Sequence, residues 1–161
     1  MKDKLIILIS IIIDGIIPNI TLFNFNNITY FTPICTGVSL VFLYKENKKF
    51  YLLLLYTIIV YAGLYINNLL LSGIVFFSIA LMLKIFKKFF RDNMFTVVIQ
   101  ILLVIFLWDL IMFIFQSLFV VNSFLWGNYF YKITHSILFN IIYGIILFKI
   151  CNKCSKINAL E

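Results

Sequence analysis

The sequence predicts an all-α membrane protein with six transmembrane helices, cytoplasmic N- and C-termini and short loops. Of its 161 residues, 64% are hydrophobic and 12% are charged, and the mean hydropathy is +1.11. Soluble domains have about half apolar and a quarter charged residues. Apolar runs also recur along the whole chain, so residues 1–158 are expected to form one integral membrane domain. Residues 159–161 fit the start of an appended linker.

Each apolar run is interpreted as a helix, because open sheet edges are not tolerated in lipid and a helical span needs about 20 mainly apolar residues. The expected spans are residues 5–23, 30–44, 50–66, 69–86, 94–121 and 131–150. The first has no small-residue cleavage site after it, so it is interpreted as a retained span rather than a signal peptide. The second is short for a full span, whereas the fifth is long enough to require tilt or protrusion.

The basic residues give the orientation. With six spans, all 13 lysine and arginine residues except Lys132 fall on the side that carries both termini. Positive charge in short loops stays in the cytoplasm, so that side is expected to be cytoplasmic. Topology alone can account for the basic loops and for the net charge of +7, so nucleic acid is not implied. A sharper interpretation is that four of them contact the anionic inner leaflet: Lys84, Lys87, Lys88 and Arg91.

Two aspartates lie inside predicted spans, where a charge costs at least a few kcal/mol and marks a functional or packing site. Asp14 lies in SIIIDGIIPN, on one helix face with Ser10 and Pro18. Gly15 and Pro18 make this helix liable to bend. We therefore favour a kink that Asp14 stabilises, or a contact made by Asp14, over a catalytic role.

Two other stripes predict faces for helix packing or partner binding. Asp109, in FLWDLIMF, shares a face of the fifth span with Gln116. In the last span Ser136, Asn140 and Gly144 recur every four residues. Small residues let helix backbones approach, and asparagine can hydrogen-bond across the gap.

The residues predict neither an enzyme nor a cofactor. Cys151 and Cys154 form a lone C-x-x-C, which lacks the second ligand pair of a zinc site, so two solvated or interfacial thiols are expected and no metal. Prolipoprotein signal peptidase has a similar size and two catalytic aspartates. Its Asn- and Gly-rich motifs do not surround Asp14 or Asp109, so no catalytic residue is assigned.

Three segments, in order, resemble the rod shape-determining MreD family. Residues 32–79 are similar to its Pro-led second span, basic hairpin and third span, with GLYINNLLLSG placing Ile66 where members often have Asp. Residues 93–119 match its long span, with Asp109 at the acidic position. ITHSILFNIIYGIIL is similar to its last span, where Asn140 matches and the proline-bearing start is replaced.

The resemblance implies a non-enzymatic component of the bacterial cell-elongation (Rod) complex in the plasma membrane, which supports cell shape and peptidoglycan side-wall synthesis. Its implied partner is MreC and, indirectly, MreB, RodA and a class B penicillin-binding transpeptidase, with membrane lipids and a homo-oligomer as further candidates. Two alternatives stay open. One is the substrate-binding S-component of an energy-coupling-factor vitamin transporter, which shares a six-helix fold with the family. The other is an intramembrane aspartyl enzyme, which requires Asp14 and Asp109 to meet.

Overall fold

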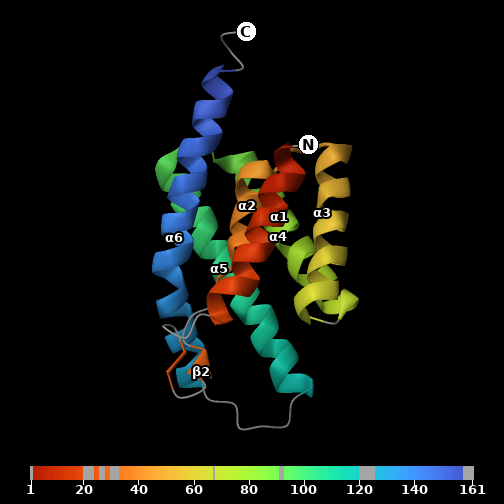
Figure 1. The fold of residues 1–161 in the computed structure, drawn as a ribbon, viewed down its shortest axis with the longest axis vertical. Helices are drawn as coiled ribbons and strands as arrows, with labels where there is room; N and C mark the ends of the chain where they lie inside the picture. The colour runs from red at the N-terminus through yellow and green to blue at the C-terminus, as the bar shows by residue number, and fades with distance from the viewer. Residues whose placement is uncertain are drawn as a thin grey trace.

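The chain folds mainly into helices that lie side by side (Figure 1). The computed structural model describes residues 2–19, 24–25, 28–29, 33–66, 68–90, 93–119 and 126–157. Its α-helices are α1 (Lys2–Ile16), α2 (Cys35–Leu43), α3 (Lys48–Tyr61), α4 (Leu69–Phe89), α5 (Met94–Phe119) and α6 (Trp126–Ile157). A 3₁₀ turn, η1 (Ile17–Asn19), follows α1, and a π-helical turn, η3 (Ala62–Ile66), follows α3. Between α1 and α2, the strands β1 (Asn24–Phe25) and β2 (Ile28–Thr29) pair antiparallel.

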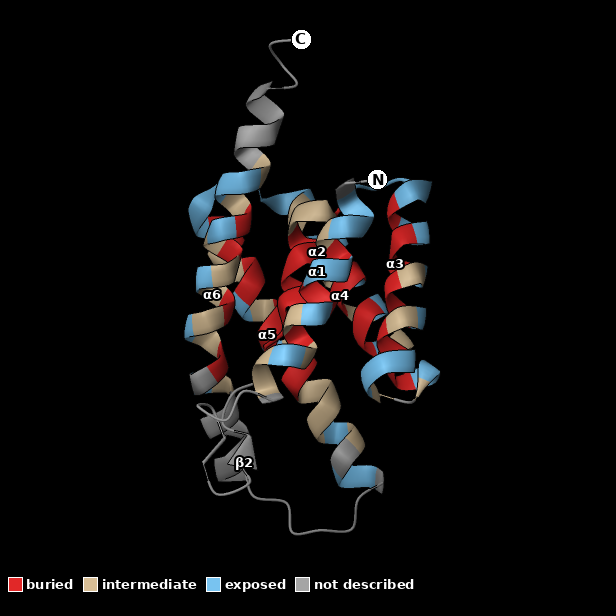
Figure 2. Cartoon of the chain, in the orientation of Figure 1, coloured by how far each residue is buried: buried red, intermediate tan, exposed pale blue. Residues whose placement is uncertain are grey.

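Three of the described helices are long and apolar enough to cross a membrane. They are Lys48–Ile66, Leu69–Phe89 and Met94–Phe115, with mean hydropathies of 1.7, 2.4 and 2.8. Their inward faces are buried and their outward faces are exposed, as Figure 2 shows. The outward residues are themselves large and apolar, such as Leu52, which is 67% exposed, and Leu70, which is 69% exposed. An outer surface of this kind suits lipid and not water, so the protein is a helical membrane protein.

Both ends of the helical core lie at the same end of the molecule (Figure 1). The start of α1, the turn between α2 and α3, the end of α4 and the last turns of α6 are all found there. We call it the basic end, because lysines gather in the turn between α2 and α3 together with the start of α3, and again in the last turns of α4. α5 is inclined to its neighbours, and its last turns extend beyond the opposite end (Figure 1).

The second span differs from its prediction. A helix was expected over residues 30–44, but α2 has nine residues, and residues 30–32 lie outside the described part. At about 1.5 Å per residue, nine residues cover roughly half of a 30 Å hydrocarbon core. The helix starts only after Pro33, whose ring restricts the residue before it and which has no N–H to donate.

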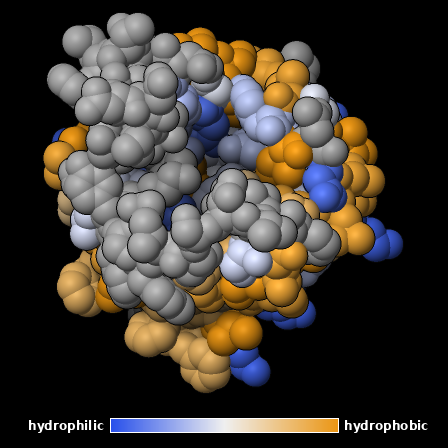
Figure 3. Space-filling view, turned by 90° about the horizontal axis from the view of Figure 1, so that it is seen from below, coloured by the Kyte–Doolittle hydropathy of each residue, from blue (hydrophilic) through white to orange (hydrophobic). Residues whose placement is uncertain are grey.

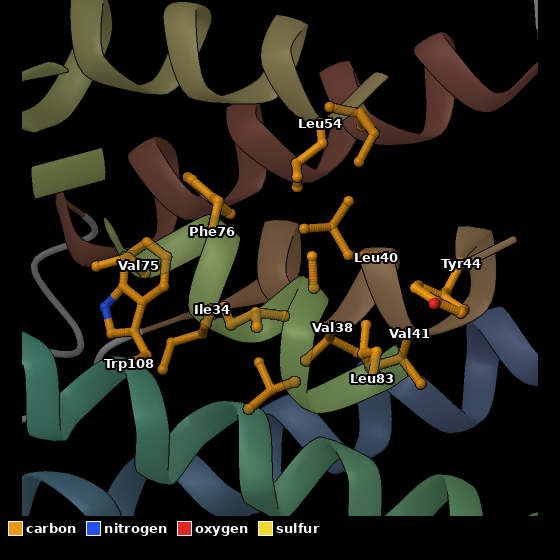
Figure 4. Close-up of a cluster of buried hydrophobic side chains, with 14 of the residues drawn as sticks. Ile34, Val38, Leu40, Val41, Tyr44, Leu54, Val75, Phe76, Leu83 and Trp108 are labelled. Carbon is orange, nitrogen blue, oxygen red and sulfur yellow. The ribbon is translucent and has the colours of Figure 1, made fainter. Parts of the chain in front are cut away.

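This short helix is the centre of the bundle. α2 packs against α1, α4, α5 and α6, and every residue from Cys35 to Val41 is buried. Small side chains allow this, since a Cβ added to Gly37 would lie 2.9 Å from Val104 Cγ1. Apolar side chains from α3, α4 and α5 close around it (Figure 4). Between helices in lipid the gain comes from van der Waals packing, because lipid tails are as apolar as the side chains.

Asparagine residues begin three of the other helices. The side-chain oxygens of Asn47, Asn68 and Asn93 accept hydrogen bonds from the N–H groups of Phe50, Leu71 and Thr96. Such caps satisfy the first N–H groups of a helix, which have no partner within it. The residue at the corresponding position of α2 is Ile34, which has no side-chain acceptor. The buried start of α2 must therefore find its acceptors elsewhere.

Candidate functional site

The acceptors at the start of α2 come from α1 and α6. Ile34, Cys35 and Thr36 are all 0% exposed, so water does not reach their backbone amides from outside. Inside a membrane each such group must be satisfied by the protein itself. Asp14 and Asn140 do so. We use the name α2 cap cluster for these residues and the groups hydrogen-bonded near them on α1 and α6: Ser10, Asp14, Ile34, Cys35, Thr36, Ser136, Asn140 and Tyr143.

Asp14 makes the main contact. Its Oδ1 accepts a hydrogen bond from the Cys35 N–H at 2.6 Å. Its Oδ2 accepts from the Thr36 N–H at 2.9 Å and from Thr36 Oγ1 at 2.6 Å. The carboxylate thus stands at the positive end of the α2 dipole, which favours a negative charge. These three hydrogen bonds join α1 to the start of α2.

Of the two roles expected for Asp14, a kink within α1 or a contact, these hydrogen bonds show a contact. The hydrogen bonds of Asp14 run to α2, not to the backbone of its own helix. The physical reason lies in the donors. A proline at position 18 frees a carbonyl group, which is an acceptor, and an ionised carboxylate is an acceptor as well. Only a helix start offers the N–H groups that a carboxylate needs.

Asn140 supplies the remaining acceptor from α6. Its Oδ1 accepts a hydrogen bond from the Ile34 N–H at 2.8 Å, and its Nδ2 donates to the Ser136 carbonyl oxygen at 2.9 Å. Both ends of the amide are used, so its orientation is defined. Ser136 and Asn140 are 0% exposed. One turn further, Gly144 lies close to α5, because a Cβ there would be 2.2 Å from Ile101 Cδ1. The stripe predicted on the last span therefore faces the interior.

A second contact joins α1 directly to α6. The Ser10 hydroxyl donates to the Ile6 carbonyl oxygen at 2.7 Å. Its single hydrogen is then used, so the Tyr143 hydroxyl, 2.8 Å from Ser10 Oγ, is the donor of the bond between them. α1, α2 and α6 are thus joined through buried polar groups in the middle of an apolar bundle.

Gly15 and Tyr65 form a contact that the sequence pattern did not indicate. The Tyr65 hydroxyl, from η3, donates to the Ile11 carbonyl oxygen of α1 at 2.7 Å. A Cβ at Gly15 would overlap the end of the Tyr65 ring. A larger residue at position 15 would therefore require that ring to move.

An aromatic cluster next to Tyr65 was also missed. Tyr61 lies edge-on to three rings, with centroid distances of 5.0 Å to Tyr65, 5.2 Å to Phe76 and 5.4 Å to Trp108. Edge-to-face pairs at these distances are favourable beyond the area they bury. The cluster joins α3 and η3 to α4 and α5. The only signal in the sequence was that Trp108 precedes Asp109.

The predicted stripe on α5 is described only in part. Asp109 is 6% exposed and lies in the interior. The Gln116 side chain lies outside the described residues. Gln100, which the sequence places on another face of the helix, is 0% exposed. Neither its Oε1 nor its Nε2 has a hydrogen-bond partner among the described residues.

The predicted inner-leaflet residues lie at the basic end. Lys84 Nζ is 3.0 Å from Glu46 Oε1, and Lys87 Nζ lies 5.6 Å from the centroid of the Tyr44 ring. Lys88 is exposed, and Arg91 lies outside the described residues.

The chemistry of the α2 cap cluster is that of a structural joint. Both oxygens of Asp14 accept hydrogen bonds from the chain. Among the described residues, no group of three or more His, Cys, Asp or Glu side chains is placed to hold a metal ion. What the geometry supports is the fixing of a half-length helix between two others.

Comparison of the chain with protein-family models, with curated proteins and with solved structures finds no match.

Proposed function

We propose that the chain is a non-enzymatic scaffold of the bacterial plasma membrane, with six spans and both termini in the cytoplasm. Within that role we propose an MreD-like component of the cell-elongation complex that binds MreC. The partner and the cellular role rest on the ordered resemblance of three segments of the sequence. The proposal that the chain is not an enzyme rests on the hydrogen bonds that its buried polar residues make within the fold.

The observation that carries the scaffold role is the hydrogen bonding of both Asp14 oxygens to α2. A catalytic carboxylate must reach a substrate, a water or a second carboxylate. The two oxygens of Asp14 instead accept three hydrogen bonds from Cys35 and Thr36. Asn140 is likewise used at both ends. Polar groups that hydrogen-bond within the fold in this way give a fixed helical framework, whose outer faces can contact another membrane protein.

The proposed topology has a direct test in the natural cysteines. Cys35 is 0% exposed, whereas Cys151 is partly exposed and lies on α6 towards the basic end. With a cytoplasmic C-terminus, a membrane-impermeant maleimide should leave intact cells unlabelled and should label inside-out vesicles at Cys151 or Cys154. A C151S/C154S variant is the control for labelling of Cys35. Labelling in intact cells would contradict the proposed orientation.

The partner is tested by co-purification from membranes. The tagged chain should recover MreC, and a second polytopic membrane protein with the same tag should not. An Asp109→Leu, Asn140→Leu double variant should recover less MreC and should fail to support rod shape. An Asp3→Leu variant, altered at an exposed acid in the first turn of α1, should behave as wild type. Retention of both the complex and cell shape in the double variant would remove the proposed role of these residues.

A small-molecule binder is the second candidate, and one observation favours it. Seen from the end opposite the N-terminus, the surface is hollowed, and hydrophilic atoms line part of the hollow (Figure 3). The sequence of the first span counts against this candidate. Vitamin-binding S-components usually dock their transmembrane partner through an Ala-x-x-x-Ala face on the first helix, whereas residues 5–23 contain no alanine. Nanomolar binding of a vitamin by the purified chain would place this function first.

A further inference from the structure

Two groups of lysines are brought together at the basic end. Lys45, Lys48 and Lys49 belong to the turn between α2 and α3 and to the start of α3, whereas Lys84, Lys87 and Lys88 lie in the last turns of α4. About 40 residues of chain separate the two groups, so their meeting depends on the fold.

Two contacts show that the groups lie side by side. Lys84 Nζ pairs with Glu46 Oε1 at 3.0 Å, and Lys87 Nζ lies over the Tyr44 ring, 5.6 Å from its centroid. Each contact therefore joins the end of α4 to the turn between α2 and α3. Glu46 is the single acidic residue in that turn, and it is already engaged by Lys84. Lys45, Lys48, Lys49 and Lys88 are exposed.

The apolar residues next to these lysines point to the class of partner. Ile85 is 62% exposed and Phe89 is 72% exposed, on the same turns of α4 as the lysines. The rings of Phe86 and Phe90 stack with centroids 4.5 Å apart, and Phe90 is 52% exposed. Such a surface is unsuited to nucleic acid or to bulk water. It suits the boundary of a bilayer, where aromatic and aliphatic groups enter the acyl region while lysines extend to the headgroups.

We propose that the two lysine groups form one binding site for anionic phospholipid headgroups. Lys84 and Lys87 lie where the two groups meet, and the packing of α4 against α2 holds the two segments together. The exposed lysines supply the charges that meet the phosphates. The site goes beyond the proposed scaffold role, since it requires neither MreC nor a cytoplasmic C-terminus.

The test is lipid retention by the full chain. The protein is purified, equilibrated in mixed micelles equimolar in phosphatidylglycerol and phosphatidylcholine, washed, and its bound lipid is quantified by mass spectrometry. Wild type should retain phosphatidylglycerol in several-fold excess. A K48Q/K49Q/K88Q variant, which leaves Lys84 and Lys87 in place, should return close to the input ratio. K149Q/K153Q/K156Q removes the same charge from α6 and should keep the excess.

A further variant distinguishes loss of the lipid site from unfolding of the protein. Glu46→Gln removes the acid that competes for Lys84, so it should increase the phosphatidylglycerol excess, an outcome that unfolding does not produce. Retention at the input ratio by wild type would overturn the proposal. So would an equal loss in both triple variants, since bulk charge and not this site would then select the lipid. An unchanged or lower excess in Glu46→Gln would also count against it.

Discussion

Asp14 and Thr36, 22 residues apart in the chain, are joined by two hydrogen bonds in the interior of the bundle. Asp14 Oδ2 accepts both the backbone N–H and the side-chain hydroxyl of Thr36. The buried Asp14 of α1 thereby caps the first turn of α2. This explains how a helix of nine residues can begin within an apolar bundle.

The Asp14 side chain should be the largest single polar contributor to stability. Asp14→Ala leaves the N–H groups of Cys35 and Thr36 buried without the Asp14 acceptor. The free energy of unfolding in detergent should therefore fall by on the order of 3 kcal/mol. Asp14→Asn keeps one acceptor oxygen and should lie between that variant and wild type. Asp3→Ala, at an exposed acid on the same helix, should stay within about 0.5 kcal/mol. Equal melting temperatures for Asp14→Ala and Asp3→Ala would show that the cap contributes nothing.

Asn140 should also stabilise the fold through its hydrogen bond to the start of α2. Asn140→Leu keeps the approximate volume but leaves the Ile34 N–H without its acceptor, so a loss of about 1–3 kcal/mol is expected. Ile142→Leu is the matched control, since Ile142 is 50% exposed on the same helix. Thermal unfolding of the two variants in one detergent makes the comparison. A loss shared by both would point to α6 packing in general.

The contact between Gly15 and Tyr65 predicts non-additive effects. Gly15→Ala must displace the Tyr65 ring, and Tyr65→Phe removes the hydrogen bond to the Ile11 carbonyl without displacing it. Each should lower stability, and the double variant should lose less than the sum, because the bond is lost only once. Gly73→Ala, where a Cβ would meet nothing within 4 Å, should instead raise stability by up to about 1 kcal/mol. Strict additivity would contradict the contact.

Replacing Gln100 should change stability in the opposite direction. Its amide is fully buried and makes no hydrogen bond to a described residue. Replacing a buried polar group by an apolar one of similar shape is close to neutral or stabilising. Gln100→Met should therefore leave the free energy of unfolding unchanged or raise it by about 1 kcal/mol at most. A loss larger than that would reveal a partner for Gln100.

The helical membrane character of the chain could be predicted from hydropathy alone. Apolar residues persist for the length of a span, and Asn68 and Asn93 mark where α4 and α5 begin. These signals are local, because a cap and its helix are neighbours in sequence. The three helices that are long enough to cross a membrane confirm this part of the prediction.

The start of α2 could not be predicted in the same way. Pro33 is a local signal for a helix start, but the sequence does not show which groups accept hydrogen bonds from the first N–H groups of α2. Those acceptors are Asp14 and Asn140, which are distant in sequence and meet the helix only in the folded chain. The sequence indicated that Asp14 and Asn140 are special, since polar residues in spans are costly. It did not indicate that both serve the same helix start.

The most direct test of the Asp14 cap is a double-mutant cycle between Asp14 and Thr36. Unfolding free energies are measured for wild type, Asp14→Ala, Thr36→Val and the double variant, and the same cycle is run with Thr57→Val. Among the described residues, the Thr57 hydroxyl donates to the Leu53 carbonyl of its own helix, so that cycle should be additive within about 0.5 kcal/mol. We predict a coupling of at least about 1 kcal/mol between Asp14 and Thr36. Additivity in both cycles would contradict the account.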